Sequence, residues 1–326
     1  MKPFGCIIDI DGVLIRDGCK IEGADKGIKL LEEHKVPYCL LTNGHGNAQY
    51  KADIVNKALG THIAPEQIVL AVSPLKDLVD DFKDKPVLIV GKEMEMDTVR
   101  SFGFKHPIYY EDYATLNPAQ FPDRYQAVHS YSIHSELDEH TQIAAIFIAH
   151  TPLNWGEAIQ IICDVLRSKD GSTGSIMDNE LILTQRVPIY LCNPDFDYAG
   201  KFSLPRMTVG AFGTCLNTIW KSITNQDLNI QFMGKPYRLS YKMAENVILK
   251  HNNDTTLFYG IGDNPISDIR GANNMKIESP YSYTSVLVES GCGNEESLKK
   301  DPPDIVSSNF LMAVKTILKM NGISIN

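Results

Sequence analysis

The sequence is poor in the features that mark secreted, membrane and nucleic-acid-binding proteins. It has seven cysteines, an odd number without CxxC spacing, so we expect neither a disulfide framework nor a zinc knuckle. No apolar run approaches the length of a membrane span, and no signal peptide is recognisable. The formal charge of −9 and the lack of basic patches argue against a nucleic-acid or anionic-membrane surface. These absences favour a reducing compartment: the cytoplasm, or the mitochondrion if an N-terminal segment has been removed.

The composition is that of a globular protein long enough for two domains, with 326 residues, 43% of them hydrophobic and 22% charged. Near both ends of the chain, apolar strands, polar strand ends and helices alternate. This pattern predicts an α/β fold with a doubly wound parallel sheet. The middle third contains its own strand and helix patterns, which predict a second α/β unit inserted into the first. We therefore expect a core domain formed by residues 1–83 and 206–326, and an inserted cap domain at residues 84–205.

The most informative stretch is the apolar run Phe4–Leu14, which contains two carboxylates one residue apart. The run predicts a buried strand that ends near Asp9, and a turn at Gly12 can bring Asp11 over Asp9. In an open α/β sheet, ligands bind at this end of the strands. Adjacent carboxylates require a cation or a proton between them, most simply Mg²⁺, and an aspartate can also attack phosphorus. The alternative interpretation is a polar loop after a strand.

Polar groups also follow three other predicted strands. The second strand ends in Thr42, Asn43 and Gly44, and the glycines there allow a tight turn whose amides can meet an anion. Lys235 follows a short strand at residues 230–233, and the strand at 256–262 leads to Asp263, Asn264 and Asp268. Each signal alone is weak, because a threonine after a strand is usually a cap and Gly-Lys-Pro is usually a turn. Their combination in this order predicts one polar site.

The four segments, DIDGV, LLTNG, GKP and GDNPISD, resemble in order the motifs of the haloacid dehalogenase (HAD) superfamily. The cap placed between the second and third motifs, the NPD segment and the GKP form of the lysine motif resemble the class IIA phosphatases, which include NagD-like enzymes. Within that class, the likeness is greatest to the cat-eye-syndrome-critical-region subfamily. The resemblance implies a Rossmann-like core with an inserted α/β cap domain of the class IIA type. One departure is His45, where relatives are expected to have glycine.

The resemblance also implies a role for each site residue. Asp9 would be the nucleophile, and Asp11 would be the general acid and base, which requires partial desolvation of its carboxyl group. The expected metal ligands of Mg²⁺ are Asp9, Asp263 and the backbone carbonyl of Asp11. Lys235 would stabilise phosphoryl charge. The remaining expected contributions are phosphate or substrate binding by Thr42, Asn43, Gly44, Asn193 and Asp195, and support from Asn264 and Asp268.

The favoured function is a Mg²⁺-dependent phosphomonoesterase that hydrolyses a small metabolite phosphate, such as a sugar or glycerol phosphate, through an aspartyl-phosphate. The alternatives are a phosphomutase, a dehalogenase, and a non-hydrolytic binding or assembly protein with the same fold. The only expected partner is the small phosphorylated substrate, with no nucleic acid and no membrane. Class IIA relatives often pair through their caps, which leaves a homodimer open.

Several other features are ambiguous in sequence alone. His129, His134, His140 and His150 crowd the middle third, but their spacing fits no helical metal pair, so we expect solvated or core histidines rather than a zinc site. His45 could touch substrate or simply tolerate the turn. The Asn-Pro-Asp segment that contains Asn193 and Asp195 could contact the leaving group or form an ordinary turn.

Local patterns predict three further elements. Asp17-Gly18 between apolar residues indicates a small hairpin beside the acids. Asn154 followed by Glu157 predicts an N-cap and the start of a helix. The proline-containing segment 109–124 is expected to be irregular.

Overall fold

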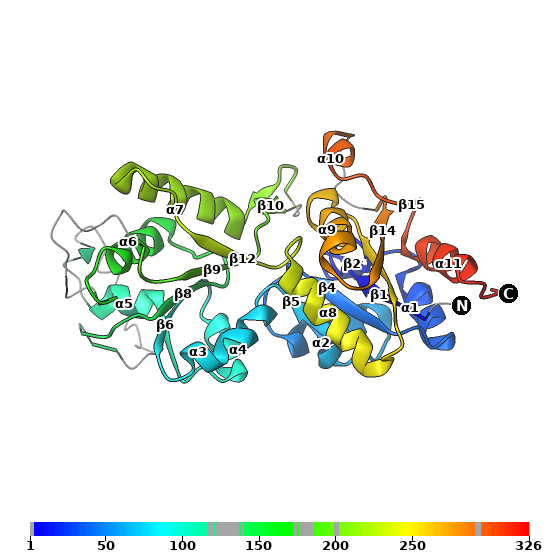
Figure 1. The fold of residues 1–326 in the computed structure, drawn as a ribbon, viewed down its shortest axis with the longest axis horizontal. Helices are drawn as coiled ribbons and strands as arrows, with labels where there is room; N and C mark the ends of the chain where they lie inside the picture. Colours follow the sequence, from blue (N-terminus) through cyan, green and yellow to red (C-terminus); the bar gives the residue numbers. More distant parts are fainter. Residues whose placement is uncertain are drawn as a thin grey trace. The chain divides into compact units, whose positions relative to one another are not determined.

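The computed structural model describes residues 3–116, 120–121, 137–138, 140–172, 175, 185–198, 202–290 and 295–325. The chain forms two compact units, which Figure 1 colours along the sequence. The first unit contains Met1–Pro74, Ala199–Leu204 and Gly234–Asn326, and the second contains Leu75–Tyr198 and Pro205–Met233. The second unit is therefore inserted into the first, as the sequence predicts.

Within the described residues, the first unit is built on a six-stranded parallel sheet. Its strands read as nearly continuous apolar runs because helices cover both faces of a parallel sheet. In spatial order they are β15 (Ile305–Ser307), β14 (Ser282–Val288), β13 (Leu257–Gly262), β1 (Phe4–Ile8), β4 (Tyr38–Thr42) and β5 (Ile68–Leu70).

The helices of the first unit bury apolar faces against this sheet. Tyr241, Ala244 and Ile248 of α8 join Ala272 and Met275 of α9 in one buried cluster with strand residues. Helices α1 and α11 pack on each other, with Phe310 lying against Gly27. The bounds are α1 (Ala24–Glu33), α2 (Ala48–Leu59), α8 (Arg238–His251), α9 (Arg270–Glu278), α10 (Glu295–Lys300) and α11 (Phe310–Met320).

A small antiparallel hairpin follows β1, formed by β2 (Ile15–Arg16) and β3 (Cys19–Lys20). Its two turn residues, Asp17 and Gly18, have φ angles of 50° and 75°. Two-residue hairpin turns favour such angles because they match the twist of the strands. The hairpin predicted from Asp17-Gly18 is confirmed.

The second unit has a five-stranded parallel sheet among its described residues. The strands are, in spatial order, β12 (Ile230–Met233), β9 (Ile189–Cys192), β8 (Ala145–Ile148), β6 (Pro86–Val90) and β7 (His106–Tyr109). Its helices are α3 (Val79–Phe82), α4 (Met94–Phe102), α5 (Tyr110–Leu116), α6 (Trp155–Leu166) and α7 (Val209–Thr224), and a short antiparallel pair links β10 (Asp197–Tyr198) to β11 (Arg206–Met207).

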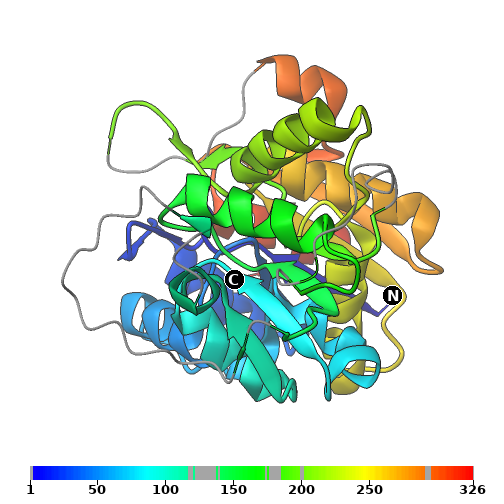
Figure 2. The same ribbon diagram turned by 90° about the vertical axis from the view of Figure 1, so that its left-hand side faces the viewer.

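Helices α6 and α7 lie side by side in the second unit, and Figure 2 looks toward them. Trp155 and Phe212 pack edge to face across this contact, with ring centroids 5.6 Å apart. The Asn154 side chain accepts a hydrogen bond from the Glu157 amide, so the predicted N-cap of α6 is confirmed.

Two sequence expectations need correction. The second unit begins at residue 75 and not at 84, and apart from Ala199–Leu204 it continues to residue 233 and not to 205, because α7 and β12 belong to it. β12 pairs in parallel with β9, with Met233 opposite Cys192. Local sequence does not encode which sheet a strand joins, and the Gly-Lys-Pro segment made this strand resemble a core strand. Of the segment 109–124 that was expected to be irregular, Tyr110–Leu116 forms α5, which buries Tyr110 and Tyr113, and residues 117–119 and 122–124 lie outside the described residues.

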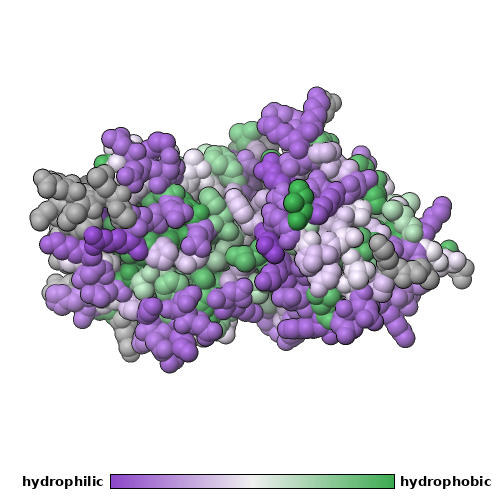
Figure 3. Space-filling model, in the orientation of Figure 1, coloured by the Kyte–Doolittle hydropathy of each residue, from purple (hydrophilic) through white to green (hydrophobic). Residues whose placement is uncertain are grey.

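Hydrophilic side chains predominate on the face of the protein shown in Figure 3. Across the part of the chain that is described, no helix combines the length and the apolar character needed to cross a membrane.

Candidate active site

The central strands of the first unit end side by side and bring the polar motifs together. Ile8 of β1 lies opposite Leu40 of β4 and Ile261 of β13, so the residues that follow these strands reach the same edge of the sheet. The Asp9 amide continues the register by donating to the Ile261 carbonyl at 2.9 Å. This edge is the carboxyl end of the strands, where open α/β sheets place their ligands.

Three buried carboxylates, which we call the acid triad, meet at this edge: Asp9, Asp263 and Asp268. One oxygen of each lies within 4.8 Å of the others. Among the described residues this is the sole group of three or more His, Cys, Asp or Glu side chains close enough to hold a metal ion. Oxygen-only donors are the ligands that hard cations such as Mg²⁺ prefer.

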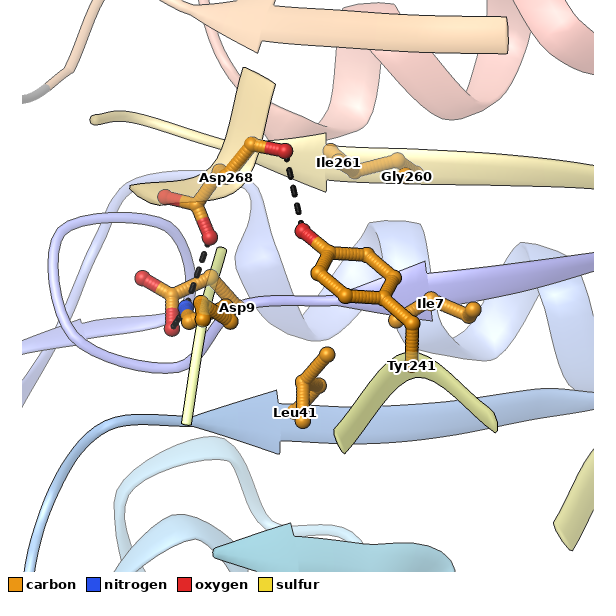
Figure 4. Close-up of a pocket in the computed structure, with 8 residues that line it drawn as sticks. Ile7, Asp9, Leu41, Tyr241, Gly260, Ile261 and Asp268 are labelled. Atoms are coloured by element: carbon orange, nitrogen blue, oxygen red, sulfur yellow. Dashed lines mark hydrogen bonds and ion pairs between the residues drawn. The ribbon is translucent and has the colours of Figure 1, made fainter. Parts of the chain in front are cut away.

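Lys235 donates hydrogen bonds to two members of the acid triad, Asp9 and Asp268. Figure 4 shows these two acids close together at the ends of their segments. The Lys235 Nζ is 2.5 Å from Asp9 Oδ1 and 2.6 Å from Asp268 Oδ1, and its side chain is only 3% exposed. A fully ionised triad carries three negative charges, and Lys235 cancels one of them. Two negative charges therefore stay unbalanced in a buried site, and one divalent cation would neutralise them.

The pKa values of these groups reflect that imbalance. Burial raises the pKa of Asp9 well above its usual range, and nearby Asp268 and Asp263 raise it further, while Lys235 opposes the shift. Burial, together with Asp268, raises the pKa of Asp263 to about 7. Burial by itself lowers the pKa of Lys235, but Asp268 and Asp9 outweigh it and hold the value well above the usual range. The site therefore favours additional positive charge.

Backbone contacts hold Lys235 and Asp268 in place. Asn43 forms a two-way clamp on the Lys235 backbone, because its Nδ2 donates to the carbonyl at 2.9 Å and its Oδ1 accepts from the amide at 2.7 Å. The Asn264 amide donates to Asp268 Oδ2 at 3.1 Å, and the Tyr241 hydroxyl donates to the Asp268 carbonyl at 2.9 Å. Asn43 thus positions the lysine, a contact that the sequence-based prediction of phosphate binding did not include.

Gly12 explains how the chain turns away from the triad. It has a φ of 91°, and a Cβ there would lie 2.2 Å from Asp263 Oδ2. Only glycine fits such a position without displacing the acid. The turn leaves the Asp11 side chain 55% exposed, with its Oδ2 accepting from Lys51 Nζ at 3.2 Å. Asp11 is therefore more exposed than the partial desolvation expected from the sequence.

The loop after β4 joins the site to the start of α2. Thr42 is buried, and its Oγ1 accepts a hydrogen bond from the Gly44 amide at 2.8 Å. Asn47 caps α2 by accepting from the Tyr50 amide at 2.8 Å, while His45 is exposed. A loop that leads into a helix N-terminus can provide amides for an anion. Anion binding by this loop stays a prediction.

Asn193 and Asp195 belong to the second unit, whereas the acid triad is built within the first. Asn193 has a φ of 94°, its Oδ1 accepts from the Asp195 amide at 2.8 Å, and its amide donates to the Met233 carbonyl at 3.0 Å. These contacts form a side-chain-capped turn. Their part in substrate binding stays a prediction.

Two of the four clustered histidines, His129 and His134, lie outside the described residues. His140 is exposed and His150 is half-buried, with its Nδ1 3.0 Å from the Thr151 carbonyl oxygen. Neither belongs to a group of three possible metal ligands within the described part of the chain.

Lys51 is the site residue that sequence reasoning missed. It shares the buried face of α2 with Val55 and Leu59, at helical spacings of four and eight residues. A lysine at an apolar position of a helix was the signal that could have found it, because lysine is almost never buried unless it is paired.

Family models match two stretches of the chain, each of which contains strands of the first unit. Residues 6–105 match the haloacid dehalogenase-like hydrolase model and residues 232–313 match a HAD-hydrolase-like model. The chain belongs to the haloacid dehalogenase-like hydrolases. The superfamily and the α/β fold predicted from the four motifs are therefore confirmed.

Two yeast relatives align along nearly the whole chain. A cardiolipin synthase/mitochondrial hydrolase fusion protein of Schizosaccharomyces pombe is 30% identical over 95% of this chain, which spans 52% of that protein. A mitochondrial hydrolase of Saccharomyces cerevisiae is 28% identical over 98% of this chain and 96% of its own length.

Solved structures share the fold. NagD from E. coli K-12 is 17% identical with a TM-score of 0.62, covering 95% of this chain and 98% of NagD. A glycerol phosphate phosphatase from Mycobacterium tuberculosis, solved in complex with magnesium, is also 17% identical with a TM-score of 0.61 over 95% of this chain and 75% of that one. These likenesses concern the architecture of the core and its cap.

Proposed function

We propose that the protein is a Mg²⁺-dependent phosphomonoesterase that acts on a small metabolite phosphate of the sugar- or glycerol-phosphate type. The observation that carries the proposal is the acid triad around Lys235, which lies at the same sheet edge as the loop after β4. The hydrolase family of the chain supports it. The fold shared with a glycerol phosphate phosphatase supports the substrate class.

The residues present fit a magnesium ion. The donors are carboxylate oxygens that lie within 4.8 Å of one another. When all three acids are ionised, their three negative charges leave a net charge of −2 after Lys235 is counted. Asp9, Asp263 and the Asp11 carbonyl would hold the ion, because both carboxylate oxygens of Asp268 already accept hydrogen bonds, Oδ1 from Lys235 and Oδ2 from the Asn264 amide. When bound, the ion would offset the repulsion between the Asp9 carboxylate and an anionic phosphate.

Asp9 would attack phosphorus, and the bond between phosphorus and the leaving oxygen would break. The attack requires ionised Asp9, a state that Lys235 favours at 2.5 Å against the effect of burial. Asp11 would donate a proton to the leaving oxygen and then accept one from the water that hydrolyses the aspartyl-phosphate. Its exposed carboxylate at the strand end has access to both. Free phosphate would leave, and both aspartates would return to their starting states.

Lys235 and the Thr42 loop would stabilise the charge on the transferred phosphoryl group. Phosphoryl transfer depends mainly on positioning and electrostatics. Fixed donors in a buried site are effective because they do not need to reorganise during the reaction. The Asn43 clamp supplies that rigidity to Lys235.

A screen of phosphorylated metabolites, with phosphate release measured with and without Mg²⁺, tests the proposal. We expect Mg²⁺-dependent release from at least one small phosphate ester. A sugar phosphate that isomerises without releasing phosphate would indicate a phosphomutase. A protein that is inert with p-nitrophenyl phosphate and every metabolite in the screen, despite bound Mg²⁺, would contradict the proposal.

The names of the two yeast relatives support a mitochondrial location for this chain. Fractionation of cells that express the full-length protein tests this location. Co-purification with a cytosolic marker would contradict it.

A further inference from the structure

Lys51 occupies a position where a lysine is unfavourable for the fold. Its side chain is 9% exposed, on the face of α2 that also buries Val55 and Leu59. It is the fourth helical residue after the Asn47 cap, near the positive end of the helix dipole, where a cation is disfavoured. Taking an ammonium group out of water adds a further cost. Structural stability alone would favour an apolar residue here.

The Lys51 ammonium is directed at the catalytic edge of the sheet. Its Nζ lies 3.2 Å from Asp11 Oδ2. A Cβ added to Gly44 would lie 2.8 Å from Lys51 Nζ and 3.0 Å from Thr42 Oγ1. The absence of a side chain at Gly44 therefore provides the space in which the ammonium group lies beside the loop. The glycine of the LTNG segment and the buried Lys51 therefore depend on each other, because a side chain at Gly44 would occupy the position of the ammonium group.

This ion pair differs from the surface pairs of the protein. Lys20–Asp25 and Lys221–Asp227 join side chains that are all at least 31% exposed, and pairs of that kind contribute little to stability. In the Lys51–Asp11 pair the lysine is fixed by burial and the aspartate is 55% exposed. The buried member has few positions available, so it can define the position of the exposed member.

Asp11 needs such a partner because the fold holds the backbone around it but leaves its side chain 55% exposed. It lies after β1, joined to Ile15 by an isolated bridge, and its side chain extends from the turn at Gly12. A carboxylate on a turn can adopt several rotamers. General acid catalysis requires the carboxyl group within hydrogen-bond reach of the leaving oxygen, and a misplacement of about 1 Å can cost about 10²-fold in rate.

We propose that Lys51 is a positioning residue that holds the Asp11 carboxyl group where it can protonate the leaving oxygen. The proposal rests on the phosphomonoesterase function above and adds a residue outside the four family motifs. Lys51 acts through Asp11, so its effect depends on how much the leaving oxygen needs a proton. An alkyl phosphate needs that proton, whereas p-nitrophenolate leaves readily without one.

The test compares Lys51→Met with the wild-type enzyme on glycerol phosphate, or on another alkyl phosphate from the screen, and on p-nitrophenyl phosphate. The ratio kcat/KM is measured because it reports the steps up to transfer of the phosphoryl group to Asp9. We expect kcat/KM for the alkyl phosphate to fall about 10²-fold, and for p-nitrophenyl phosphate to fall less than about fivefold. Inhibition by inorganic phosphate should stay within about twofold of the wild-type value.

Three controls accompany this comparison. Lys57→Met removes an exposed cation from the same helix and should leave kcat/KM unchanged for both substrates. Lys51→Gln keeps a polar side chain at the same site and provides a second variant if Lys51→Met does not fold, as judged by urea unfolding. In an Asp11→Asn background, Lys51→Met should cause no further loss in single-turnover phosphoryl transfer, because the residue it positions is gone.

Equal losses on the two substrates, with weaker inhibition by phosphate, would overturn the proposal and make Lys51 a direct phosphate ligand. Unchanged kcat/KM on both substrates, or additive losses with Asp11→Asn, would also overturn it. A wild-type enzyme without activity toward any phosphate ester would refute the proposed function instead, so the two failures are distinguishable.

Discussion

The two units of this protein use the same architecture and differ in the residues at the carboxyl ends of their strands. Both contain a parallel sheet covered by helices. In the first unit, β1 and β13 lead into the buried acids Asp9 and Asp263. In the second unit, β6 leads into Gly91, β8 into Ala149 and β9 into Asn193, while β12 leads back to Lys235 of the first unit. A parallel sheet thus supplies the location of a site, and the residues after its strands decide whether there is any chemistry.

The interiors of the two units also differ. The second unit packs Phe147 against Phe104 and Tyr190, with ring centroids 5.2 Å and 5.6 Å apart. It also buries the carboxylates Glu95 and Asp112, but these lie on α4 and α5 and join no triad of acids among the described residues. Burial of an acid is therefore not sufficient for a metal site. Several acids must converge from neighbouring strand ends.

The comparison predicts its largest effect at the nucleophile. Asp9→Asn should lower kcat by at least about 10⁴-fold, because the amide cannot attack phosphorus and no other group can replace it. The urea midpoint should not fall, since the substitution removes a buried negative charge. Asp227→Asn, an exposed site in the second unit, should leave kcat within about twofold of wild type. Wild-type turnover by Asp9→Asn would contradict the role of Asp9 as nucleophile, and with it the assignment of the chemistry to the first unit.

Lys235→Met should have the next largest effect. Without the ammonium group, the three acids of the triad lose their internal counter-charge, so we expect kcat to fall about 10²–10³-fold. Removing one partner of a buried ion pair typically costs about 3–5 kcal/mol of stability, and urea unfolding in EDTA measures that loss. Mg²⁺ should reduce the loss because it balances the negative charges that Lys235 no longer compensates.

The matched control for this variant is Lys221→Met in the second unit, which breaks an exposed pair with Asp227. Its unfolding free energy should change by less than about 1 kcal/mol. Similar losses in the two variants would mean that burial of Lys235 has no electrostatic consequence.

The pH dependence of stability should separate the units without any activity assay. The pKa of Asp263 is about 7 in the folded protein and about 4 when unfolded, so the folded state binds more protons between these values. The unfolding free energy of the metal-free protein should therefore fall as pH rises from about 4 to 7, by up to about 1.4 kcal/mol per pH unit for this group. Above pH 7 its contribution should be constant.

Urea unfolding in EDTA at pH 5, 6, 7 and 8 measures this slope, and Asp263→Asn should reduce it. Asp170 in the second unit has the opposite shift, because a hydrogen bond from Ser175 lowers its pKa to about 2. Asp170→Asn should therefore leave the slope above pH 5 unchanged. An unfolding free energy that rises with pH between 5 and 7 in the metal-free protein would contradict the charge imbalance at the triad.

The smallest effect is expected at the turn that follows β9. Asn193 has a φ of 94°, so Asn193→Ala should cost about 1–2 kcal/mol through backbone strain and the lost hydrogen bond to Asp195. Asn193→Gly should cost less because glycine accepts this φ. Urea unfolding of the two variants checks the order. A larger KM for Asn193→Gly, at unchanged stability, would instead support the predicted contact with substrate.

Local sequence was sufficient to predict those elements that depend on short-range patterns. The cap at Asn154 and the hairpin at Asp17-Gly18 follow from capping and turn preferences. The acids after β1 and β13 were recognisable because each follows an apolar run. Their convergence was also predictable, because parallel strands share one carboxyl edge.

Tertiary structure decided three matters that no short pattern contains. The sheet to which residues 230–233 belong depends on pairing with β9, which is distant in the chain. The exposure of Asp11 depends on the turn at Gly12, where the closeness of Asp263 leaves no room for a side chain. The approach of Lys51 to Asp11 depends on the packing of α2 beside the sheet. Neighbouring residues determine local conformation, whereas distances between distant residues are set only when the chain packs.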